Sequence, residues 1–243
     1  MLIVTRLINL LRNRIGPDAK KRRKAAKREA KRQRFEEGSD WDKGSEFATR
    51  QYQSYDEYVQ HQASKLDKVA HRLNRNRAQE LEEFRERFEL CDQLKEARNV
   101  LCLGARLGCE VEALHRLGYF AVGLDLNPGN DNPYVLPGDF HAIVFPDDSV
   151  DAIYSNAIDH VFDIEKLIGE VVRILRPDGI FIAEIETGFE EGHVPGEFES
   201  MHWRNANSII ERMAKAGPLE IEKVHDLGQT RRNERKLIVY RNP

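Results

Sequence analysis

The sequence is poor in the residues that build disulfide frameworks and metal centres. Among 243 residues there are three cysteines, Cys91, Cys102 and Cys109, and their spacing matches no paired metal-ligand motif. We therefore expect reduced thiols in a cytoplasmic protein, without a zinc site or another bound metal. A long apolar run is also missing. Residues 1–15 are partly apolar, but arginines interrupt them, so this segment is too short and too charged to span a bilayer and is a poor signal peptide.

Acidic residues are scarce at the beginning of the chain. Residues 1–35 contain 13 Lys and Arg and only two acids, a balance of +11, whereas the rest of the chain has a balance of −14. We predict a basic arm over residues 1–35, with a short amphipathic helix over residues 1–15 and a basic helix or coil over residues 19–34. The apolar face of the first segment favours an anionic membrane surface as its partner. Nucleic acid is the less favoured partner, and a solvated arm without a partner is the other alternative.

Two segments connect this arm to the rest of the chain. Residues 36–51 are polar and contain Gly and Ser, which is typical of a linker. Residues 52–92 have apolar side chains at helical spacing and predict a helical cap that packs on a sheet. In the alternative, the cap is part of a lid, and Tyr58, His61 or Lys65 faces a ligand pocket.

The most informative stretch is residues 99–128, NVLCLGARLGCEVEALHRLGYFAVGLDLNP. One apolar run ends at Gly104, a helical pattern follows Gly108, and a second apolar run ends in Asp125. Glycines at such a turn let backbone N–H groups approach a ligand at the positive end of a helix, and an acid after the second strand can accept from a ribose diol. We infer a site for a nucleoside-containing cofactor. In the structural alternative, the glycines only permit a tight turn.

The alternation of strands and helices continues to the end of the chain. Strands are predicted at 134–136, 150–155, 180–185, 219–225 and 236–241, and helices at 163–175 and 203–216. Because no helix separates the last two strands, we predict an α/β fold over residues 93–243, a Rossmann-like, doubly wound and mostly parallel sheet that ends in an antiparallel hairpin. An α-helical N-terminal extension precedes it. The connection from Asp125 to Tyr134 is too short for the usual crossover helix, which we expect to be missing.

Four segments carry a family resemblance, in the order and at about the spacing that the family shows. They are VLCLGARLG (100–108), VGLDLNP (122–128), GDFHAIVFPDDSVDAIYSNA (138–157) and RILRPDGIFIAEI (173–185). On these segments the chain resembles the class I S-adenosylmethionine-dependent methyltransferases, in particular the type 11 group. The resemblance covers about residues 99–188 and extends less distinctly to residue 240. It implies S-adenosylmethionine as the cofactor.

The resemblance also implies the cofactor contacts. The matching positions are Gly104, Ala105 and Gly108 for the methionine part, Asp125 and Leu126 for the ribose and adenine, Asp139 and Phe140 for the adenine, and Asn156 beside the methyl group. In the structural alternative, Asp125 caps a helix and Asp139 closes a turn. Two positions depart from the family pattern: Cys102 stands where an acid is usual, and Arg106 replaces the middle glycine. The Arg106 side chain could reach the cofactor carboxylate or could narrow the pocket.

Candidate catalytic residues follow the predicted strand 150–155, where the resemblance places the methyl group. Asp159 and His160 come directly after it, and a histidine that titrates near neutral pH suits proton removal from a hydroxyl. Alternatively, Asp159 caps the next helix and His160 packs beneath the loop. His193 and His202 lie in the insert after strand 180–185 and are the second choice, as substrate contacts.

We predict an S-adenosylmethionine-dependent methyltransferase that O-methylates a hydroxylated small molecule or glycan near a membrane surface. Such an enzyme would be cytoplasmic and peripheral at the membrane. One alternative is an RNA methyltransferase that uses the basic arm. The other is a non-catalytic, methyltransferase-like binding protein, which Cys102 and Arg106 favour and the two acids Asp125 and Asp139 oppose.

Overall fold

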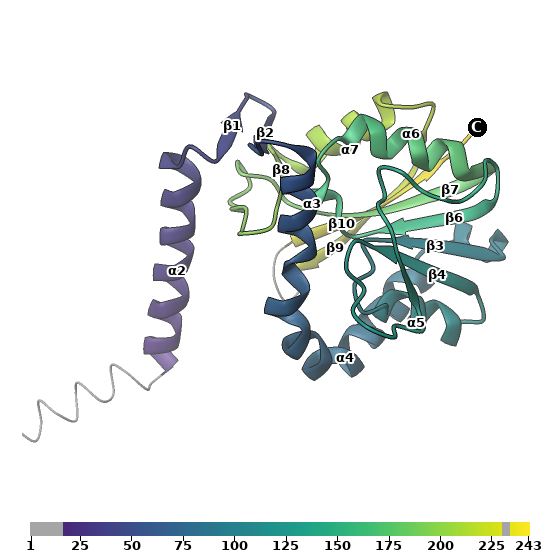
Figure 1. The fold of residues 1–243 in the computed structure, drawn as a ribbon, viewed down its shortest axis with the longest axis horizontal. Coiled ribbons are helices and arrows are strands. Elements are labelled where there is room, and N and C mark those ends of the chain that lie inside the picture. Colours follow the sequence, from purple (N-terminus) through teal and green to yellow (C-terminus); the bar gives the residue numbers. More distant parts are fainter. Residues whose placement is uncertain (1–16, 230–233) are drawn as a thin grey trace, which may run out of the picture.

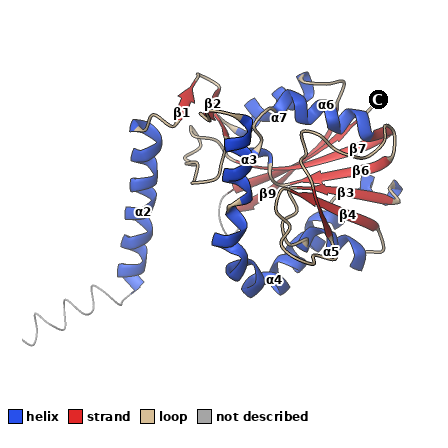
Figure 2. Cartoon of the chain, viewed as in Figure 1, coloured by secondary structure: helices blue, strands red, loops and turns tan. Residues whose placement is uncertain are grey.

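The computed structural model describes residues 17–229 and 234–243, so the predicted amphipathic segment 1–15 lies outside the described residues. A seven-stranded sheet forms the centre of the molecule, with helices on both faces (Figures 1 and 2). Its strands, in spatial order, are β5 (Val135–Pro137), β4 (Phe120–Asp125), β3 (Asn99–Leu103), β6 (Val150–Ser155), β7 (Leu175–Glu186), β10 (Glu234–Arg241) and β9 (Glu220–Gln229).

Strand direction confirms the predicted fold class. The five strands from β5 to β7 are parallel to their neighbours, whereas β10 is antiparallel to both β7 and β9. The interior strand β3 is buried on both faces, since Val100, Leu101, Cys102 and Leu103 are all at most 3% exposed. Parallel strands covered on both sides have such continuous apolar sequences, which is why this strand was readable from the sequence.

One face of the sheet is covered by α6 (Ile164–Ile174) and α7 (Ala206–Lys215) (Figure 1). The helix α6 begins because the Asp163 side chain accepts a hydrogen bond from the N–H of Lys166, 3.0 Å away. It buries a complete apolar stripe, in which Ile164, Ile168 and Val171 are fully inaccessible. Each such side chain contributes about 1.5–3 kcal/mol to stability by its burial.

The opposite face is covered by α4 (Lys65–Glu89) and α5 (Cys109–Arg116). Phe84 and Phe88 of α4 pack edge-on against Tyr154 of β6, with ring centroids 6.0 and 5.0 Å apart. The shorter helix α3 (Tyr55–Ala63) precedes α4 and begins at Ser54, whose hydroxyl accepts from the N–H of Glu57. These helices therefore belong to the same core as the sheet.

No helix connects β4 to β5, as the short connection predicted. Asparagine side chains take the place of the helical hydrogen bonds there. The side chain of Asn132 donates to the carbonyl of Pro128 at 2.8 Å and accepts from the N–H of Tyr134 at 2.9 Å. The loop is thus held closed, and β5 still pairs in parallel with β4.

The basic segment forms α2 (Pro17–Glu37), which stands beside the body of the molecule (Figure 1). Phe35 at its end packs against Trp41, Phe189 and His202. Residues 36–51, predicted as a linker, instead contain β1 (Trp41–Lys43) and β2 (Phe47–Arg50). No helix within residues 17–229 and 234–243 is both long and apolar enough to cross a membrane.

The reason for this difference lies in distant pairing. Strand β2 pairs antiparallel with β1 on one side and with β8 (Met201–Trp203) on the other, more than 150 residues further along the chain. Only Trp41 and Ala48 of the two early strands are buried, so their own sequence is too polar to predict a sheet.

Candidate active site

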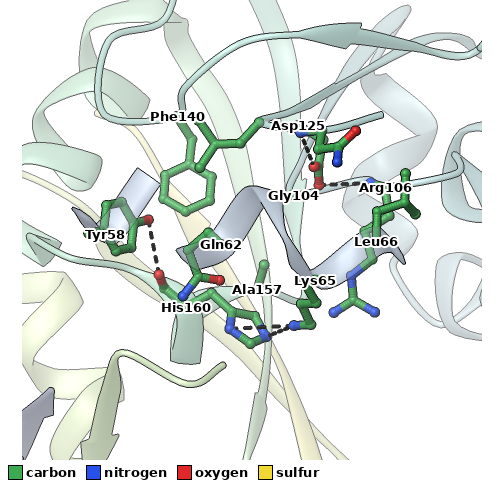
Figure 3. Close-up of a pocket in the computed structure, with 12 residues that line it drawn as sticks. Tyr58, Gln62, Lys65, Leu66, Gly104, Arg106, Asp125, Phe140, Ala157 and His160 are labelled. Atoms are coloured by element: carbon green, nitrogen blue, oxygen red, sulfur yellow. Dashed lines mark hydrogen bonds between the residues drawn. The ribbon is translucent and has the colours of Figure 1, made fainter. Parts of the chain in front are cut away.

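A pocket opens at the carboxyl ends of β3, β4 and β6, beneath α3 and the beginning of α4 (Figure 3). It contains about 480 Å³ of empty space, part of it open to solvent. Its lining residues are Tyr58, Gln62, Lys65, Leu66, Gly104, Arg106, Asp125, Leu126, Asn127, Phe140, Ala157 and His160. Five of the predicted cofactor contacts and one predicted catalytic residue are among them. The carboxyl ends of parallel strands are where α/β sheets bind ligands.

The glycine turn after β3 forms the floor of this pocket. Gly104 has φ +73°, and a Cβ there would lie 2.6 Å from the Cβ of Ala157, so a larger residue does not fit. Its N–H donates to the carbonyl of Leu124 at 2.8 Å, which fixes the turn to the end of β4. Gly108, also at φ +73°, precedes the first residue of α5 and packs against Tyr134 outside the pocket.

Arg106 occupies a backbone conformation that glycine usually takes, with φ +47°. Its N–H donates to Oδ2 of Asp125 at 2.9 Å, and this hydrogen bond helps to hold the conformation. The side chain lines the pocket, as Figure 3 shows, and its guanidinium makes no hydrogen bond or ion pair with another described residue. Arg106 therefore places a free cation at the methionine end that the family resemblance predicts.

Asp125 is the acid at the end of β4, and both of its oxygens are used within the turn. Oδ2 accepts from Arg106, and Oδ1 accepts from the N–H of Asn127 at 2.9 Å. Burial raises the pKa of this carboxyl, although the two N–H groups oppose the shift. A carboxylate has about four acceptor positions, so two remain for ligand hydroxyls. Asp125 thus fits the predicted role of ribose acceptor.

Asp139 lies next to the pocket and is not one of its lining residues. Its Oδ2 accepts from the hydroxyl of Tyr55 at 2.5 Å, and its Oδ1 accepts from the N–H of His141 at 2.8 Å. The ring Nδ1 of His141 is 3.0 Å from the same oxygen. Burial acts to raise the pKa of Asp139, but these hydrogen bonds outweigh it and lower the pKa. The carboxylate is therefore held ionised beside the pocket by a residue of α3.

Five other predicted contacts differ in how they are placed. Ala105 is 2% exposed and belongs to the core against α5, so its side chain does not line the pocket. Gly108 and Asn156 are also outside the lining, whereas Ala157, which follows Asn156, is part of it. Leu126 and Phe140 do line the pocket and offer the apolar surface that an aromatic base requires.

His160 faces the pocket, and its hydrogen bonds define the tautomer of the ring. Nδ1 lies 2.8 Å from the carbonyl oxygen of Phe198, which can only accept, so Nδ1 carries the hydrogen. Nε2 is then the acceptor, and it contacts Nζ of Lys65 (Figure 3). The backbone carbonyl of His160 accepts from the hydroxyl of Tyr58 at 3.1 Å. Burial lowers the pKa of this imidazole well below its ordinary value, so the ring is neutral at pH 7.

Lys65 is the first residue of α4 and reaches into the same pocket. Burial, followed by repulsion from the nearby Arg106 guanidinium, lowers the pKa of its ammonium to about 7. A lysine with such a pKa can take up and release a proton at neutral pH. Tyr58 and Lys65 therefore face the pocket, as the lid alternative expects, whereas His61 is not among the lining residues.

The remaining predicted site residues lie outside the pocket. Asp159 does not line it, although its Oδ1 lies 3.7 Å from Nε2 of His160; burial, followed by repulsion from Glu186, raises the pKa of its carboxyl. His193 lies 3.2 Å from Glu186, and burial lowers its pKa. His202 packs against Phe35, and burial lowers its pKa to about 3. Neither histidine lines the pocket, so a substrate role for them has no support from its geometry.

Four lining residues were not predicted. Two of them, Gln62 and Leu66, lie on the helices that cover the pocket. Gln62 and Leu66 share a helical face with Tyr58, at spacings of four and eight residues. That spacing is visible in the sequence, although which face meets the pocket depends on tertiary packing. Asn127 and Ala157 are the other two, and both follow directly after a predicted contact residue.

These residues fit a nucleoside cofactor that carries an amino-acid chain. An acid that accepts from two backbone N–H groups, an apolar surface and a cation lie in one pocket, which provides for a ribose, a base and a carboxylate respectively. The fold and this pocket match the class I S-adenosylmethionine-dependent methyltransferase fold that the four sequence segments resemble.

Comparison with known proteins agrees with this class. Residues 101–183 match the type 11 family model, described as "Methyltransferase domain". The chain therefore carries a methyltransferase domain of this family, and S-adenosylmethionine is its cofactor. No curated protein matches the sequence.

Several solved structures are similar to this chain at low sequence identity. One is a chain from the complex between the Haloferax volcanii Trm112 methyltransferase activator and a proposed methyltransferase, with 20% identity, a TM-score of 0.58, and coverage of 75% of this chain and 97% of that one. An S-adenosylmethionine-dependent methyltransferase from Mesorhizobium loti has 19% identity, a TM-score of 0.48, and coverage of 60% and 90%. Geranyl diphosphate C-methyltransferase from Streptomyces coelicolor has 16% identity, a TM-score of 0.47, and coverage of 60% and 72%.

Proposed function

We propose that this enzyme transfers the methyl group to a hydroxyl oxygen of a small molecule or a glycan. The observation that carries the proposal is the contact between Lys65 and His160 in the pocket wall. A hydroxyl acceptor must lose its proton during the reaction, and both groups of this pair bind protons. A neutral thioether or an activated carbon acceptor would have less need of such a pair.

S-adenosylmethionine, when bound, supplies a methyl group on a sulfonium; transfer forms a C–O bond, breaks the S–C bond with its electron pair left on sulfur, and frees the hydroxyl proton. The protein's own residues bind and orient the reactants. Asp125 accepts from the ribose hydroxyls, and Asp139 from the adenine amino group. The guanidinium of Arg106 holds the methionine carboxylate, as a planar fork suits. The pair of His160 and Lys65 takes up the proton that the acceptor hydroxyl loses.

Two measurements test this proposal. The full chain is titrated with S-adenosylmethionine and S-adenosylhomocysteine by calorimetry, and labelled-methyl transfer is then screened on hydroxylated small molecules, glycans and RNA. For an active acceptor, His160→Ala should keep cofactor affinity within a few-fold and lose about 10²–10⁴-fold in turnover. His71→Ala, an exposed histidine of α4, is the matched control and should keep full turnover. Binding of neither cofactor, or transfer only to carbon or sulfur atoms, would contradict the proposal.

We further propose that the acceptor is met at an anionic membrane surface. Exposed basic side chains along α2 support this, including Arg22, Arg23 and Lys27. The helix also contacts the insert after β7, because the guanidinium of Arg28 donates to the carbonyl of Gly192 at 2.7 Å. Clustered basic residues gain about 1 kcal/mol each near an anionic membrane.

Liposome flotation tests the membrane proposal. The full chain should float with anionic vesicles and remain in solution with neutral ones, and the triple variant Arg22→Gln, Arg23→Gln and Lys27→Gln should float less. A chain without residues 1–34 should not float. Equal flotation of all three chains would contradict the proposal. Salt-sensitive RNA binding that depends on the same three side chains would favour an RNA methyltransferase instead.

A further inference from the structure

Lys65 has an unusual environment for a partly buried cation. Its Nζ contacts Nε2 of His160, a neutral ring, and it forms no ion pair within the part of the chain that the structure describes. Buried ammonium groups usually have a carboxylate partner, because an uncompensated charge is costly to bury. The ammonium group of Lys65 therefore holds its extra proton weakly in this pocket.

Charged groups face Lys65 from each element packed around it. They are Arg106 of the glycine turn, Asp125 at the end of β4, Asp159 after β6, and Glu199 before β8. The three acids favour the ammonium form, whereas burial and Arg106 disfavour it, and the second group prevails. Arg106 cannot lose its own proton in a protein. Any additional positive charge in this pocket must therefore act on the proton of Lys65.

We propose that Lys65 is a catalytic base of the methyl transfer, and that binding of the positively charged sulfonium cofactor expels its proton to solvent. This inference rests on the proposed function at the same pocket. The neutral amine would donate one N–H to Nε2 of His160, whose Nδ1–H is fixed by the Phe198 carbonyl. That hydrogen bond orients the amine and leaves its lone pair available for the hydroxyl proton of the acceptor.

Lys65 should therefore release its proton when S-adenosylmethionine binds, because its sulfur is charged, and should keep it when S-adenosylhomocysteine binds. S-adenosylmethionine and S-adenosylhomocysteine share the adenosine, ammonium and carboxylate groups and differ at the sulfur. A comparison of the two cofactors therefore isolates the effect of the sulfonium charge. Because the pKa of Lys65 is about 7, half of the molecules carry this proton at pH 7. Two positive charges about 6 Å apart repel strongly enough to shift a pKa by about two units at an effective dielectric constant near 20.

Isothermal titration in two buffers with different ionisation enthalpies measures this release directly. At pH 7, S-adenosylmethionine should release about half a proton per molecule bound, and S-adenosylhomocysteine should release close to none. Lys65→Met should bind both cofactors without any difference in release. Lys68→Met is the matched control, since Lys68 is an exposed residue of the same helix paired with Glu197, and it should behave as the unchanged protein.

A second measurement needs no variant. If the sulfonium selects the neutral amine, the affinity for S-adenosylmethionine relative to S-adenosylhomocysteine should increase about tenfold from pH 6 to pH 8. Equal proton release with the two cofactors, a release that persists in Lys65→Met, or a pH-independent affinity ratio would overturn the inference and leave the methyltransferase function intact. Failure of both cofactors to bind would instead overturn the proposed function, and this inference with it.

Discussion

The hydroxyl of Tyr55 donates a 2.5 Å hydrogen bond to Oδ2 of Asp139 and so ties the lid helix α3 to the acid predicted to contact adenine. The ring of Tyr55 also packs edge-on against Phe162, with centroids 5.2 Å apart. Tyr55 and Asp139 are both partly buried, so water does not fully replace their hydrogen bond when it is lost. The lid and the cofactor pocket are therefore energetically coupled at this point.

Tyr55→Phe should lower the free energy of unfolding by about 1–2 kcal/mol at pH 7, because it removes a hydrogen bond to a charged acceptor. Since the pKa of Asp139 is lowered by folding, the stability that its ionisation provides is present above its ordinary pKa of 3.8 and is lost as the pH falls through the folded value. The difference between variant and parent should thus shrink below pH 3.8.

Urea unfolding at several pH values measures this effect. Tyr119→Phe is the control, because the Tyr119 hydroxyl has no hydrogen-bond partner within residues 17–229 and 234–243. An equal loss of stability in both variants would mean that Tyr55 acts through ring packing alone.

Asp125→Asn should weaken S-adenosylmethionine binding by about 10–100-fold, since a charge-assisted hydrogen bond contributes about 1.5–3 kcal/mol. Asp125→Ala should abolish detectable binding. Circular dichroism checks that both variants fold, and calorimetry measures affinity. Asp131→Asn, an exposed acid of the same loop, should bind normally. Unchanged affinity in Asp125→Ala would remove Asp125 from the cofactor site.

Most of the sheet could be predicted because its signals are local. Strands β3, β4 and β6 are apolar runs that end at a glycine, an acid or a polar residue, and the apolar stripe of α6 repeats at helical spacing. The pocket residues on the glycine turn and on β4 followed from the same segments. Such positions depend on the chain immediately around them.

The remaining features depend on contacts between distant parts of the chain. The pair of Lys65 and His160 joins residues 95 positions apart, and nothing near either residue marks the other as its partner. The same applies to β2 and β8, whose pairing made a sheet of a segment that resembles a linker. We predicted substrate contacts at His193 and His202 because both lie in an insert after a strand. Both side chains are instead buried outside the pocket.

Two glutamates of α5 should respond oppositely to pH. Burial raises the pKa of Glu110 to about 8, so its carboxyl is protonated in the folded chain at pH 7 and ionised in the unfolded chain. Its contribution to stability is therefore present below its ordinary pKa of 4.5 and is lost as the pH rises toward 8. Glu110→Gln cannot ionise and should gain about 1–3 kcal/mol over the parent at pH 7.

Glu112→Gln is the matched comparison. Partial burial acts to raise the pKa of Glu112, but hydrogen bonds from Arg77 and Arg116 outweigh it and lower the pKa. This variant should lose about 1 kcal/mol at pH 7, and the loss should disappear as the pH falls below 4.5. Urea unfolding at about pH 3.5, 5, 7 and 8 distinguishes the two. If the advantage of Glu110→Gln did not grow with pH, Glu110 would be ionised in the folded protein.

Gly104→Ala tests whether the pocket floor requires a residue without a side chain. At φ +73° an alanine costs about 1 kcal/mol of backbone strain, and the clash with Ala157 adds about 1–3 kcal/mol of overpacking. Gly118→Ala separates the two costs, because Gly118 also has a positive φ, +93°, but nothing lies within 4 Å of its added Cβ. We therefore expect Gly104→Ala to lower the unfolding free energy by about 2–4 kcal/mol and Gly118→Ala by about 1 kcal/mol. Since Gly104 and Ala157 both line the pocket, only Gly104→Ala should also weaken cofactor binding, and equal losses in both variants would show that backbone strain alone accounts for the glycine.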